Sequence, residues 1–401
     1  MNIAIAQSGG PTCAINASLL GVFKQALKSP QIDKIFGSLN GIEGIIKDKL
    51  VDLKEIIKTD EDMNLVRLTP STILGSCRYK LPAPDEKSEV YSAILECFKK
   101  HDIGAFFYIG GNDSMDTVAK LSAFFREYNS DIKVIGIPKT IDNDLPETDH
   151  TPGFGSAAKY VAVTLQEITR DSSVYSADSV TIVEIMGRHA GWLTASNCVL
   201  HANGETAPHL IYLPECNFSA EKFIADVKAQ QKKHKAVIVA ISEGVQLPDD
   251  DGSYQSGQVD TFGHKYLSGI GKLLENLVRE KIGCKVRSIE LNVMQRCSSH
   301  LCSATDIEEA ELIGAKGLDA ALDGKSGVTM VFKRVSDKPY KIAIDSADSN
   351  LIANAEKFLP KEWINSEENN ILPEAIDYFL PLIQGEIQTP MNNGMPVHFK
   401  I

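Results

Sequence analysis

Short apolar runs alternate with longer stretches of helical periodicity along this chain. The runs are bounded by Gly, Asp or Ser and are almost continuously apolar, which favours buried parallel strands covered on both faces. Strands are predicted at residues 3–6, 105–109, 134–137, 180–185 and 237–241. Helices are predicted between them, among others at residues 17–27, 88–100 and 117–125. Strands that alternate with helices indicate βαβ units and a doubly wound α/β fold.

Finer features of the pattern predict where some elements begin and end. Asn16 and Ser114 are expected to cap two helices. The segment 247–263, with its acidic run at 249–251, is typical of a long surface loop. The tail from Ser346 is expected to hold two helices, around residues 351–358 and 373–382. With 401 residues, the chain is long enough for two domains and a sizeable core.

The composition is that of an ordinary globular protein, with 43% hydrophobic and 23% charged residues. The formal net charge of −12 argues against nucleic acids and anionic membranes as general partners, since both need basic surfaces. No apolar run approaches the roughly 20 residues that span a bilayer, and the N-terminus has no signal-peptide pattern. The eight cysteines are scattered, which favours reduced thiols. We therefore expect a cytoplasmic protein.

Polar motifs follow several predicted strands at their carboxyl ends. They are SGG at 8–10, GGNDS at 110–114, PKTIDND at 138–144 and MGR at 186–188. In open α/β sheets, ligands bind just outside the carboxyl ends of the strands. The motifs are therefore expected to surround one ligand site.

The two glycine motifs are typical of anion binding at helix N-termini, because glycine lets backbone amides approach a ligand closely. The first is neither a dinucleotide-binding nor a P-loop pattern, and a simple tight turn is an equally good interpretation. In the second, Asn112 and Asp113 present side-chain oxygens, which suit Mg²⁺ beside a phosphate. The alternative is an Asn-Asp turn that caps the following helix.

The PKTIDND motif places two carboxylates, Asp142 and Asp144, directly after a strand and behind Lys139 and Thr140. Phosphoryl transfer to a hydroxyl needs a group that accepts its proton and cations around the phosphoryl group. Asp142 is predicted to be the proton acceptor and Lys139 one of the cations. An Asp-rich structural turn is the alternative at this point.

Five further basic residues follow glycine turns or flank apolar segments. They are Arg78 and Lys80 in STILGSCRYK, Arg188 in VEIMGRHAGW, and Arg287 and Arg296 in KVRSIELNVMQRC. One such arginine is usually a surface ion pair, but the set together with Lys139 predicts a cationic cleft in an acidic protein. Such a cleft suits a ligand with more than one phosphate.

The segment CSSHLC at 297–302 raises the question of a zinc site. Zinc needs a second pair of ligands at suitable spacing, and the sequence offers none. Core thiols and a surface His300 are the favoured interpretation.

The motifs together resemble the phosphofructokinase family in order and spacing. The matching segments are SGG, GSCR, GGNDS, TIDND, TDHTPGFGSA, VEIMGR, SEG and QR, within residues 1–325. The resemblance implies two Rossmann-like domains with the active site between them. The donor-binding domain is expected to hold residues 1–150 and about 297–345, and the sugar-phosphate domain residues 151–296 and about 346–401. It also implies a homodimer or homotetramer with shared active sites, and Mg²⁺ as cofactor.

The resemblance also implies roles for single residues. Asp142 matches the base that acts on the 1-hydroxyl of fructose 6-phosphate, with Thr140 and Asp144 beside it. Sugar-phosphate contacts are expected from Met186, Gly187, Arg188 and Glu243. Arg287 and Arg296 match arginines of the 6-phosphate site, one of which usually comes from a neighbouring subunit. Contacts to the donor are expected from Gly10, Arg78, Lys80 and Gly111, with Asn112 at the metal.

Two positions bear on the phosphoryl donor. Members that use ATP resemble GGDGS and GTIDND, whereas this chain has Asp113 and Lys139 in place of the two glycines. These replacements are typical of pyrophosphate-dependent members. A carboxylate at 113 adds bulk and negative charge where the α-phosphate and ribose of ATP would lie, and Lys139 supplies a compact cation for pyrophosphate.

Alternatives and departures from the family pattern accompany this interpretation. The rival functions are an ATP-dependent 6-phosphofructokinase and a non-catalytic regulatory subunit that binds sugar phosphate. Asn112 stands where aspartate is commoner in the family, so metal binding there is expected to be weaker or mediated by water. Ser179 and Val293 also differ from residues common in the family, so the 6-phosphate pocket is expected to be completed differently. Sedoheptulose 7-phosphate stays open as an acceptor, and the tail after about residue 325 carries no functional inference.

Overall fold

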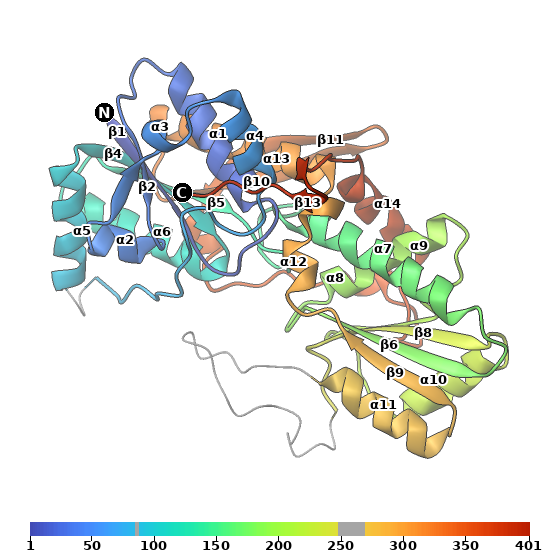
Figure 1. Cartoon of the computed structure of the whole chain (residues 1–401). Helices are drawn as coiled ribbons and strands as arrows, with labels where there is room; N and C mark the ends of the chain where they lie inside the picture. The colour runs from blue at the N-terminus through green and yellow to red at the C-terminus, as the bar shows by residue number, and fades with distance from the viewer. Residues whose placement is uncertain (85–87, 248–268) are drawn as a thin grey trace.

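The computed structural model describes residues 1–84, 88–247 and 269–401. These residues form two α/β regions that lie side by side, each built around its own sheet (Figure 1). The first sheet has seven strands in the order β11-β10-β5-β4-β1-β2-β3. Their bounds are β1 Asn2–Gln7, β2 Ile35–Ser38, β3 Leu50–Asp52, β4 Ile103–Gly110, β5 Lys133–Pro138, β10 Val328–Asp337 and β11 Tyr340–Asp348. The inner strands pair in parallel, and β3 and β11 are antiparallel edges.

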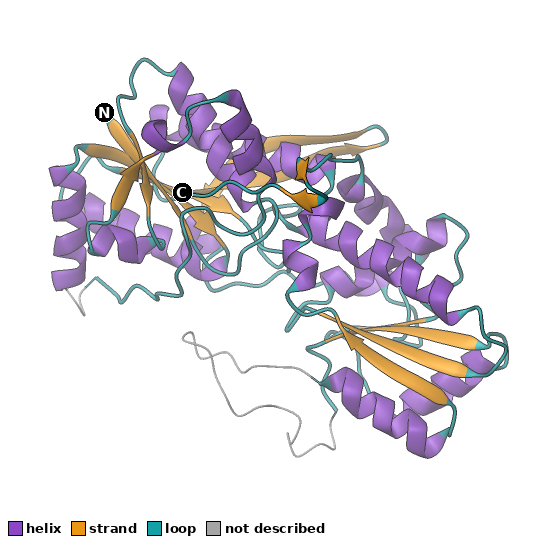
Figure 2. Cartoon of the chain, viewed as in Figure 1, coloured by secondary structure: helices purple, strands orange, loops and turns teal. Residues whose placement is uncertain are grey.

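Helices cover both faces of this sheet (Figure 2). They are α1 Ile15–Lys28, α2 Ile42–Ile46, α3 Leu53–Ile56, α4 Asp60–Leu68, α5 Ser88–Lys100, α6 Asn112–Glu127 and α13 Ala304–Leu322. Alternate residues of β1 enter different cores: Ile3 and Ile5 pack towards α1, whereas Ala4 and Ala6 pack with residues of α5 and α6. Because both faces are buried, the strand is continuously apolar, as the sequence pattern predicts.

Helices α1 and α13 pack closely because each has a glycine at the contact. A Cβ on Gly21 would lie 1.9 Å from the carbonyl oxygen of Glu311, and a Cβ on Gly314 would lie 2.1 Å from that of Ser18. The approach brings α13, from late in the chain, onto the first sheet. The chain therefore returns to its N-terminal sheet after building the second one.

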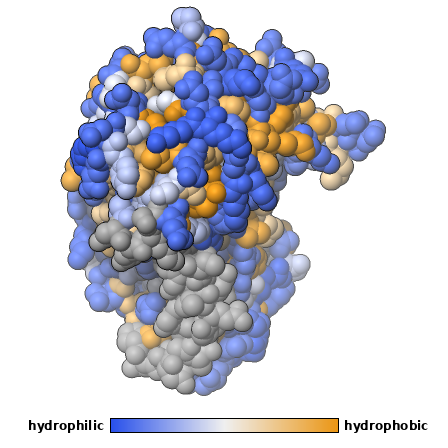
Figure 3. Space-filling model, turned by 90° about the vertical axis from the view of Figure 1, so that its left-hand side faces the viewer, coloured by the Kyte–Doolittle hydropathy of each residue, from blue (hydrophilic) through white to orange (hydrophobic). Residues whose placement is uncertain are grey.

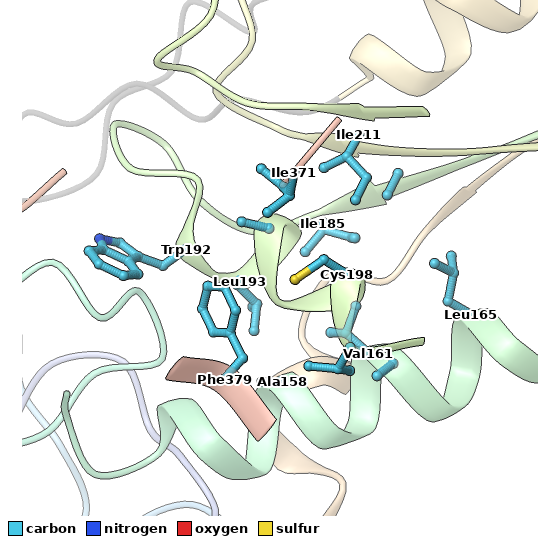
Figure 4. Packing of buried hydrophobic residues seen from close by; sticks show 14 of the residues in the cluster. Ala158, Val161, Leu165, Ile185, Trp192, Leu193, Cys198, Ile211, Ile371 and Phe379 are labelled. Carbon is cyan, nitrogen blue, oxygen red and sulfur yellow. The ribbon is translucent and has the colours of Figure 1, made fainter. Parts of the chain in front are cut away.

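The second sheet has four parallel strands in the order β7-β8-β6-β9. Their bounds are β6 Ser179–Ile185, β7 Leu210–Tyr212, β8 Ala236–Ser242 and β9 Lys285–Glu290. The helices of this region are α7 Phe154–Ser172, α8 Trp192–Ala195, α9 Val199–Ala202, α10 Ala220–Gln231, α11 Ile270–Lys281, α12 Met294–Cys297 and α14 Ile376–Phe379. Val161 of α7, Ile185 of β6 and Phe379 of α14 meet in its main core (Figure 4).

The C-terminal tail packs against both regions. Ile371 and Phe379 join the core under the second sheet, whereas Phe399 packs on the first core and donates its backbone N–H to Thr69. The tail ends with the short pair β12 Met391–Asn392 and β13 Met395–Pro396. It is therefore shared between the two regions, and the domain boundaries drawn from the sequence stay a prediction.

The five predicted strands are confirmed as β1, β4, β5, β6 and β8, and the α/β class with mostly parallel sheets is confirmed with them. The three predicted helices lie within α1, α5 and α6. Residues 373–382 are helical, as the short run Pro373–Ala375, Ile376–Phe379 and Leu380–Ile383. The predicted helix at 351–358 is wrong, because the chain leaves a 3₁₀ turn, Ser349–Leu351, and continues without regular structure from residue 355.

Both predicted caps are wrong. Asn16 lies inside α1, where its amide accepts from Gln7 and from the backbone of Ile73 and donates to the carbonyl of Thr69. Ser114 lies in the first turn of α6, and its hydroxyl bonds to that of Ser8, 2.5 Å away. Tertiary partners therefore take both side chains. The predicted surface loop at 247–263 falls outside the described residues, apart from Leu247.

On the face shown in Figure 3, hydrophilic residues dominate and apolar residues form smaller areas between them. Among the described residues, no helix is both long and apolar enough to cross a membrane. In the segment 297–302, Cys302 is buried and His300 is exposed, as expected. Cys297 is exposed, so the prediction that its thiol lies in the core is wrong.

Candidate active site

The carboxyl ends of the two sheets face each other across a cavity of about 600 Å³. The loop after β1 contributes Gly10, and the loop after β5 contributes residues 139–142 and Asp144. Arg188 after β6 and Glu243 after β8 enter from the other side. The motifs predicted to share one site therefore do meet, although they lie on different sheets.

The two aspartates of PKTIDND lie in the wall of this cavity. Asn143 between them adopts a left-handed conformation (φ 55°), which asparagine tolerates, and donates to the hydroxyl of Tyr378 over 2.9 Å. The Thr140 hydroxyl accepts from the backbone N–H of Asp142 over 3.1 Å and lies 3.3 Å from the carboxylate of Asp142. Thr140, in the same turn, therefore fixes both the backbone and the side chain of Asp142.

Burial makes the carboxyl groups at the cavity weaker acids than usual, because it raises their pKa values. Burial raises the pKa of Asp142, although its bond to Thr140 and the charges of Arg188 and Lys139 oppose the rise. The pKa of Asp144 is raised to about 7 by burial and by the charge of Asp142. Glu243, across the cavity, has its pKa raised to about 7 by burial and by Asp142. Carboxyl groups with such pKa values are suited to accepting protons near neutral pH.

Cations line the side of the cavity next to the first glycine loop. Lys139 is 2% exposed, and its ammonium donates to the carbonyl of Gly10 over 2.6 Å. Burial lowers its pKa to about 7, although Asp142 opposes this. Burial and the charge of Arg78 also lower the pKa of Arg296. A Cβ on Gly10 would lie 3.0 Å from a guanidinium nitrogen of Arg296, so glycine leaves room for this cation.

The GGNDS motif forms the N-terminus of α6 at the cavity, with Gly111 at the N-cap. Asp113, in the first turn, lines the cavity. Both polar atoms of the Asn112 amide bond to the tail: the oxygen accepts from the backbone N–H of Asn354, and the nitrogen donates to the carbonyl of Ala355. Asn112 therefore fixes the tail to α6, which leaves its predicted metal role untested.

The predicted sugar-phosphate residues lie at the cavity, with the exception of Arg287. Met186, Arg188, Glu243 and Arg296 line the cavity, and Gly187 lies between the first two with its N–H donated to Glu243 over 3.4 Å. Thr140 and Asp142 line the cavity as well, and so do Arg78, Lys80 and Gly111 of the predicted donor set.

Arg287 is not brought to this cavity within one chain. It lies on β9 and lines, together with Ser179, a separate pocket of about 80 Å³, and its side chain is 47% exposed. Its guanidinium is 3.7 Å from the carboxylate of Asp171. Val293 is also exposed and is not part of the cavity wall. If Arg287 serves a 6-phosphate site, it does so outside the cavity of its own chain.

The tail contributes three residues to the cavity wall, although the sequence gave no functional inference there. They are Asn354, Glu356 and Phe358. The segment has no glycine turn and follows no strand end of a parallel sheet, so the pattern used for the other motifs did not detect it. His189, next to Arg188, was also missed; its ring nitrogen lies 2.6 Å from the carboxylate of Glu356.

A buried ion-pair network anchors the far end of the loop that carries the aspartates. The ring nitrogens of His150 lie 2.8 Å from the carboxylate of Asp149 and 2.7 Å from that of Glu309. Arg334 donates to Asp149, and the Tyr340 hydroxyl donates to Glu309. Burial lowers the pKa of His150, but its bonds to the two carboxylates outweigh burial, and the net pKa is raised.

His150→Gln is expected to lower the free energy of unfolding by about 3 kcal/mol at pH 6, because it removes a buried charge between two carboxylates. The folded pKa lies above the ordinary value of 6.5, so this stabilisation is complete below pH 6.5 and is lost as pH rises through the folded pKa. Urea unfolding at pH 6 and pH 9 measures the difference. An equal loss at both pH values would contradict a charged His150, and His201→Gln serves as control.

Residues 2–321 match the family model described as phosphofructokinase. The chain is 37% identical over 398 residues to pyrophosphate–fructose 6-phosphate 1-phosphotransferase of Halomonas elongata, covering 98% of this chain and 94% of that protein. A relative of the same description from Methylococcus capsulatus is 38% identical at the same coverage. A crystal structure of pyrophosphate-dependent phosphofructokinase from Marinobacter aquaeolei matches with a TM-score of 0.88 at 37% identity, covering 100% of this chain and 95% of that one.

Proposed function

Because this chain belongs to the phosphofructokinase family, we propose that it transfers a phosphoryl group from pyrophosphate to the 1-hydroxyl of fructose 6-phosphate, giving fructose 1,6-bisphosphate and phosphate. The observation that carries the proposal is that Asp113 and Lys139 line the same cavity as Asp142. The proposed base and the two residues expected to favour pyrophosphate thus lie in one site. The relatives that match over the full chain bear the same activity in their descriptions.

In the proposed reaction, Asp142 accepts the proton of the 1-hydroxyl as its oxygen attacks the terminal phosphorus of pyrophosphate. The bond from that phosphorus to the bridging oxygen breaks, and phosphate leaves. Lys139, Arg78 and Lys80 hold the donor, while Lys139 and Arg188 stabilise the charge that develops on the phosphoryl oxygens. Because pyrophosphate hydrolysis is less strongly driven in cells than ATP use, we expect the reaction to run readily in both directions.

Enzymes that transfer phosphoryl groups generally need a divalent metal, and we propose Mg²⁺ here. The metal would neutralise charge on the pyrophosphate oxygens. The oxygen of Asn112 already accepts from the backbone of Asn354, so pyrophosphate and water are the main expected ligands, with the carboxylate of Asp113 on the same wall. This set of ligands agrees with the coordination of Mg²⁺ in proteins, which usually retains several water ligands.

We also propose a homo-oligomer in which Arg287 serves a neighbouring chain, because in its own chain it lies outside the cavity and is half-exposed. Sedimentation of the purified protein tests this part. A cytoplasmic location belongs to the same proposal, supported by eight cysteines that are all free thiols.

The proposal is tested by initial rates with fructose 6-phosphate and Mg²⁺, with pyrophosphate and ATP offered in parallel. Turnover with pyrophosphate alone supports it. Turnover with ATP alone would show that the donor argument is wrong while leaving the base in place. Turnover with neither would favour a regulatory sugar-phosphate-binding protein or another acceptor, such as sedoheptulose 7-phosphate.

Asp113→Gly is expected to raise the rate with ATP relative to the rate with pyrophosphate by roughly tenfold to a thousandfold. The reason is that like charges about 4 Å apart repel by roughly 1 to 4 kcal/mol, and the substitution also removes bulk from the cavity. Rates with both donors measure the ratio, with Asp116→Asn, one turn further along α6, as a comparison. An unchanged ratio would show that Asp113 does not select the donor.

A further inference from the structure

Residues 354–359 of the C-terminal tail, called the tail segment here, connect loops of both sheets at the cavity. At one end, Asn354 and Ala355 hold the amide of Asn112. At the other end, the backbone N–H of Leu359 donates to the carboxylate of Glu215, over 3.2 Å. The same carboxylate accepts from the N–H of Gly191, in the loop after β6. The segment lies beyond residue 321, where the match to the family model ends.

Lys357 is the centre of this connection. Its backbone N–H donates to the carbonyl of Asp144 over 2.6 Å, so the tail is bonded directly to the loop that carries the aspartates. Its ammonium donates to the carbonyls of Thr148 and Asp149 over 3.0 and 2.8 Å. Its carbonyl accepts from the indole N–H of Trp192, and its ammonium lies 4.8 Å from the centre of that ring.

These contacts leave the ammonium of Lys357 enclosed. Burial lowers its pKa to about 8, although the charges of Asp149 and Asp144 oppose this, and Arg334 adds to the lowering. A lysine withdrawn from water costs free energy unless its bonds compensate, and here the compensation comes from carbonyls of the loop 140–151. The side chain of Lys357 therefore holds that loop in place through its carbonyl groups and is not a solvent-exposed surface group.

The tail segment also brings charge to the aspartates. Besides burial and Asp142, the charge of Glu356 raises the pKa of Asp144, whereas that of Lys357 lowers it. Burial raises the pKa of Asp142, and the charges of Arg188, Lys139 and Arg296 oppose that rise. Glu356 is itself paired with His189. Neighbouring residues of the tail thus act on the aspartate pair in opposite directions.

We propose that the tail segment is part of the catalytic centre and that Lys357 is a positioning residue, which holds the loop 140–151 so that Asp142 faces the reacting hydroxyl. The proposal rests on the proposed function, since it assumes that Asp142 accepts the proton. It assigns to the tail a role that the sequence motifs did not indicate.

Lys357→Met keeps most of the apolar stem but removes the charge and the two bonds to the loop. It is expected to lower kcat by about 10- to 100-fold, because small displacements of a reacting group are costly, while KM for fructose 6-phosphate stays close to that of the unmodified protein. The control is Lys333→Met. Lys333 also donates to a carbonyl of this loop, at Glu147, but it is half-exposed and on the outer side.

The pH profile separates positioning from mere loss of folded protein. The acidic limb of kcat/KM is expected to move to higher pH in Lys357→Met, which removes a positive charge beside Asp144, and to lower pH in Glu356→Gln, which removes a negative one. Lys357→Arg, which keeps the charge, is expected to keep the acidic limb in place. Thermal unfolding of each variant gives the folded fraction.

A Lys357→Met protein with unchanged kcat and unchanged acidic limb would overturn the proposal, as would a loss of activity that only follows the loss of folded protein. If Lys357→Met does not fold, Glu356→Gln decides: a downward shift of the limb supports the proposal and an unchanged profile overturns it. The rate of the unmodified protein with pyrophosphate is measured first. This rate tests the proposed function alone. The variants test only the role of the tail segment, because each is compared with the unmodified protein.

Discussion

Asp142→Asn is expected to lower the forward rate by at least about 10²-fold while leaving the affinity for fructose 6-phosphate largely intact. Asparagine has the shape of aspartate, so its side-chain oxygen can still accept from the Thr140 hydroxyl and its backbone N–H still donates to that hydroxyl. Its amide, however, does not take up the proton of the attacking hydroxyl. The loss should therefore appear in kcat and not in binding. Single-turnover rates and equilibrium titration with fructose 6-phosphate measure the two separately.

The matched control is Asp226→Asn, a carboxylate of α10 that accepts from Tyr212 and Lys222 away from the cavity. It should leave turnover unchanged. An Asp142→Asn protein with near-normal turnover would rule out Asp142 as the base. In that case Asp144, whose pKa is raised to about 7 and which lines the same cavity, would be the next carboxylate to test.

Lys139→Met is expected to lower kcat/KM for pyrophosphate by about 10²- to 10³-fold, the size found when one preorganised donor to a developing charge is removed. Lys139 is almost completely enclosed and its ammonium is held on the carbonyl of Gly10. Below its pKa of about 7, which burial lowers, the charge is therefore in place before the donor binds. Methionine keeps the length of the apolar stem and removes the ammonium, with its charge and its bond to the carbonyl of Gly10. Initial rates at varied pyrophosphate measure the loss.

The pH dependence tests the same residue in another way. Since burial lowers the pKa of Lys139 to about 7, the protonated form is lost as pH rises through this value, and kcat/KM is expected to fall on the alkaline side. Lys139→Arg, whose guanidinium stays charged, should lack that alkaline limb. An identical alkaline limb in both proteins would assign the titration to another group.

How much of the site was predictable depends on how each residue is placed. Residues that follow a strand directly were found from the sequence: a buried apolar run ends at the sheet edge, and the next residues must lie at its mouth. Asp142, Lys139 and Arg188 are of this kind, whereas Glu243 came only from the resemblance, and all four line the cavity. The resemblance added their expected roles, which their position alone does not give.

Other residues were placed by contacts between distant segments, which no local pattern encodes. Asn16 and Ser114 look like helix caps, but partners from elsewhere in the chain take their side chains. Asn112 looks like a metal ligand, and its amide is bonded to the tail more than 200 residues later. A polar side chain bonds to whatever the fold brings near it, so the sequence indicates its chemistry but not its partner.

The sequence by itself determined the α/β class, the strands of the two sheets that carry the motifs, and most of the charged residues that meet at their carboxyl ends. These follow from local hydrophobic periodicity and from strand direction, which are properties of short segments. Only the tertiary structure decided that the tail completes the cavity, that Lys357 bonds to the aspartate loop, and that Arg287 stays outside. These depend on where the chain returns after the second sheet, and that course is set by packing between segments far apart in the sequence.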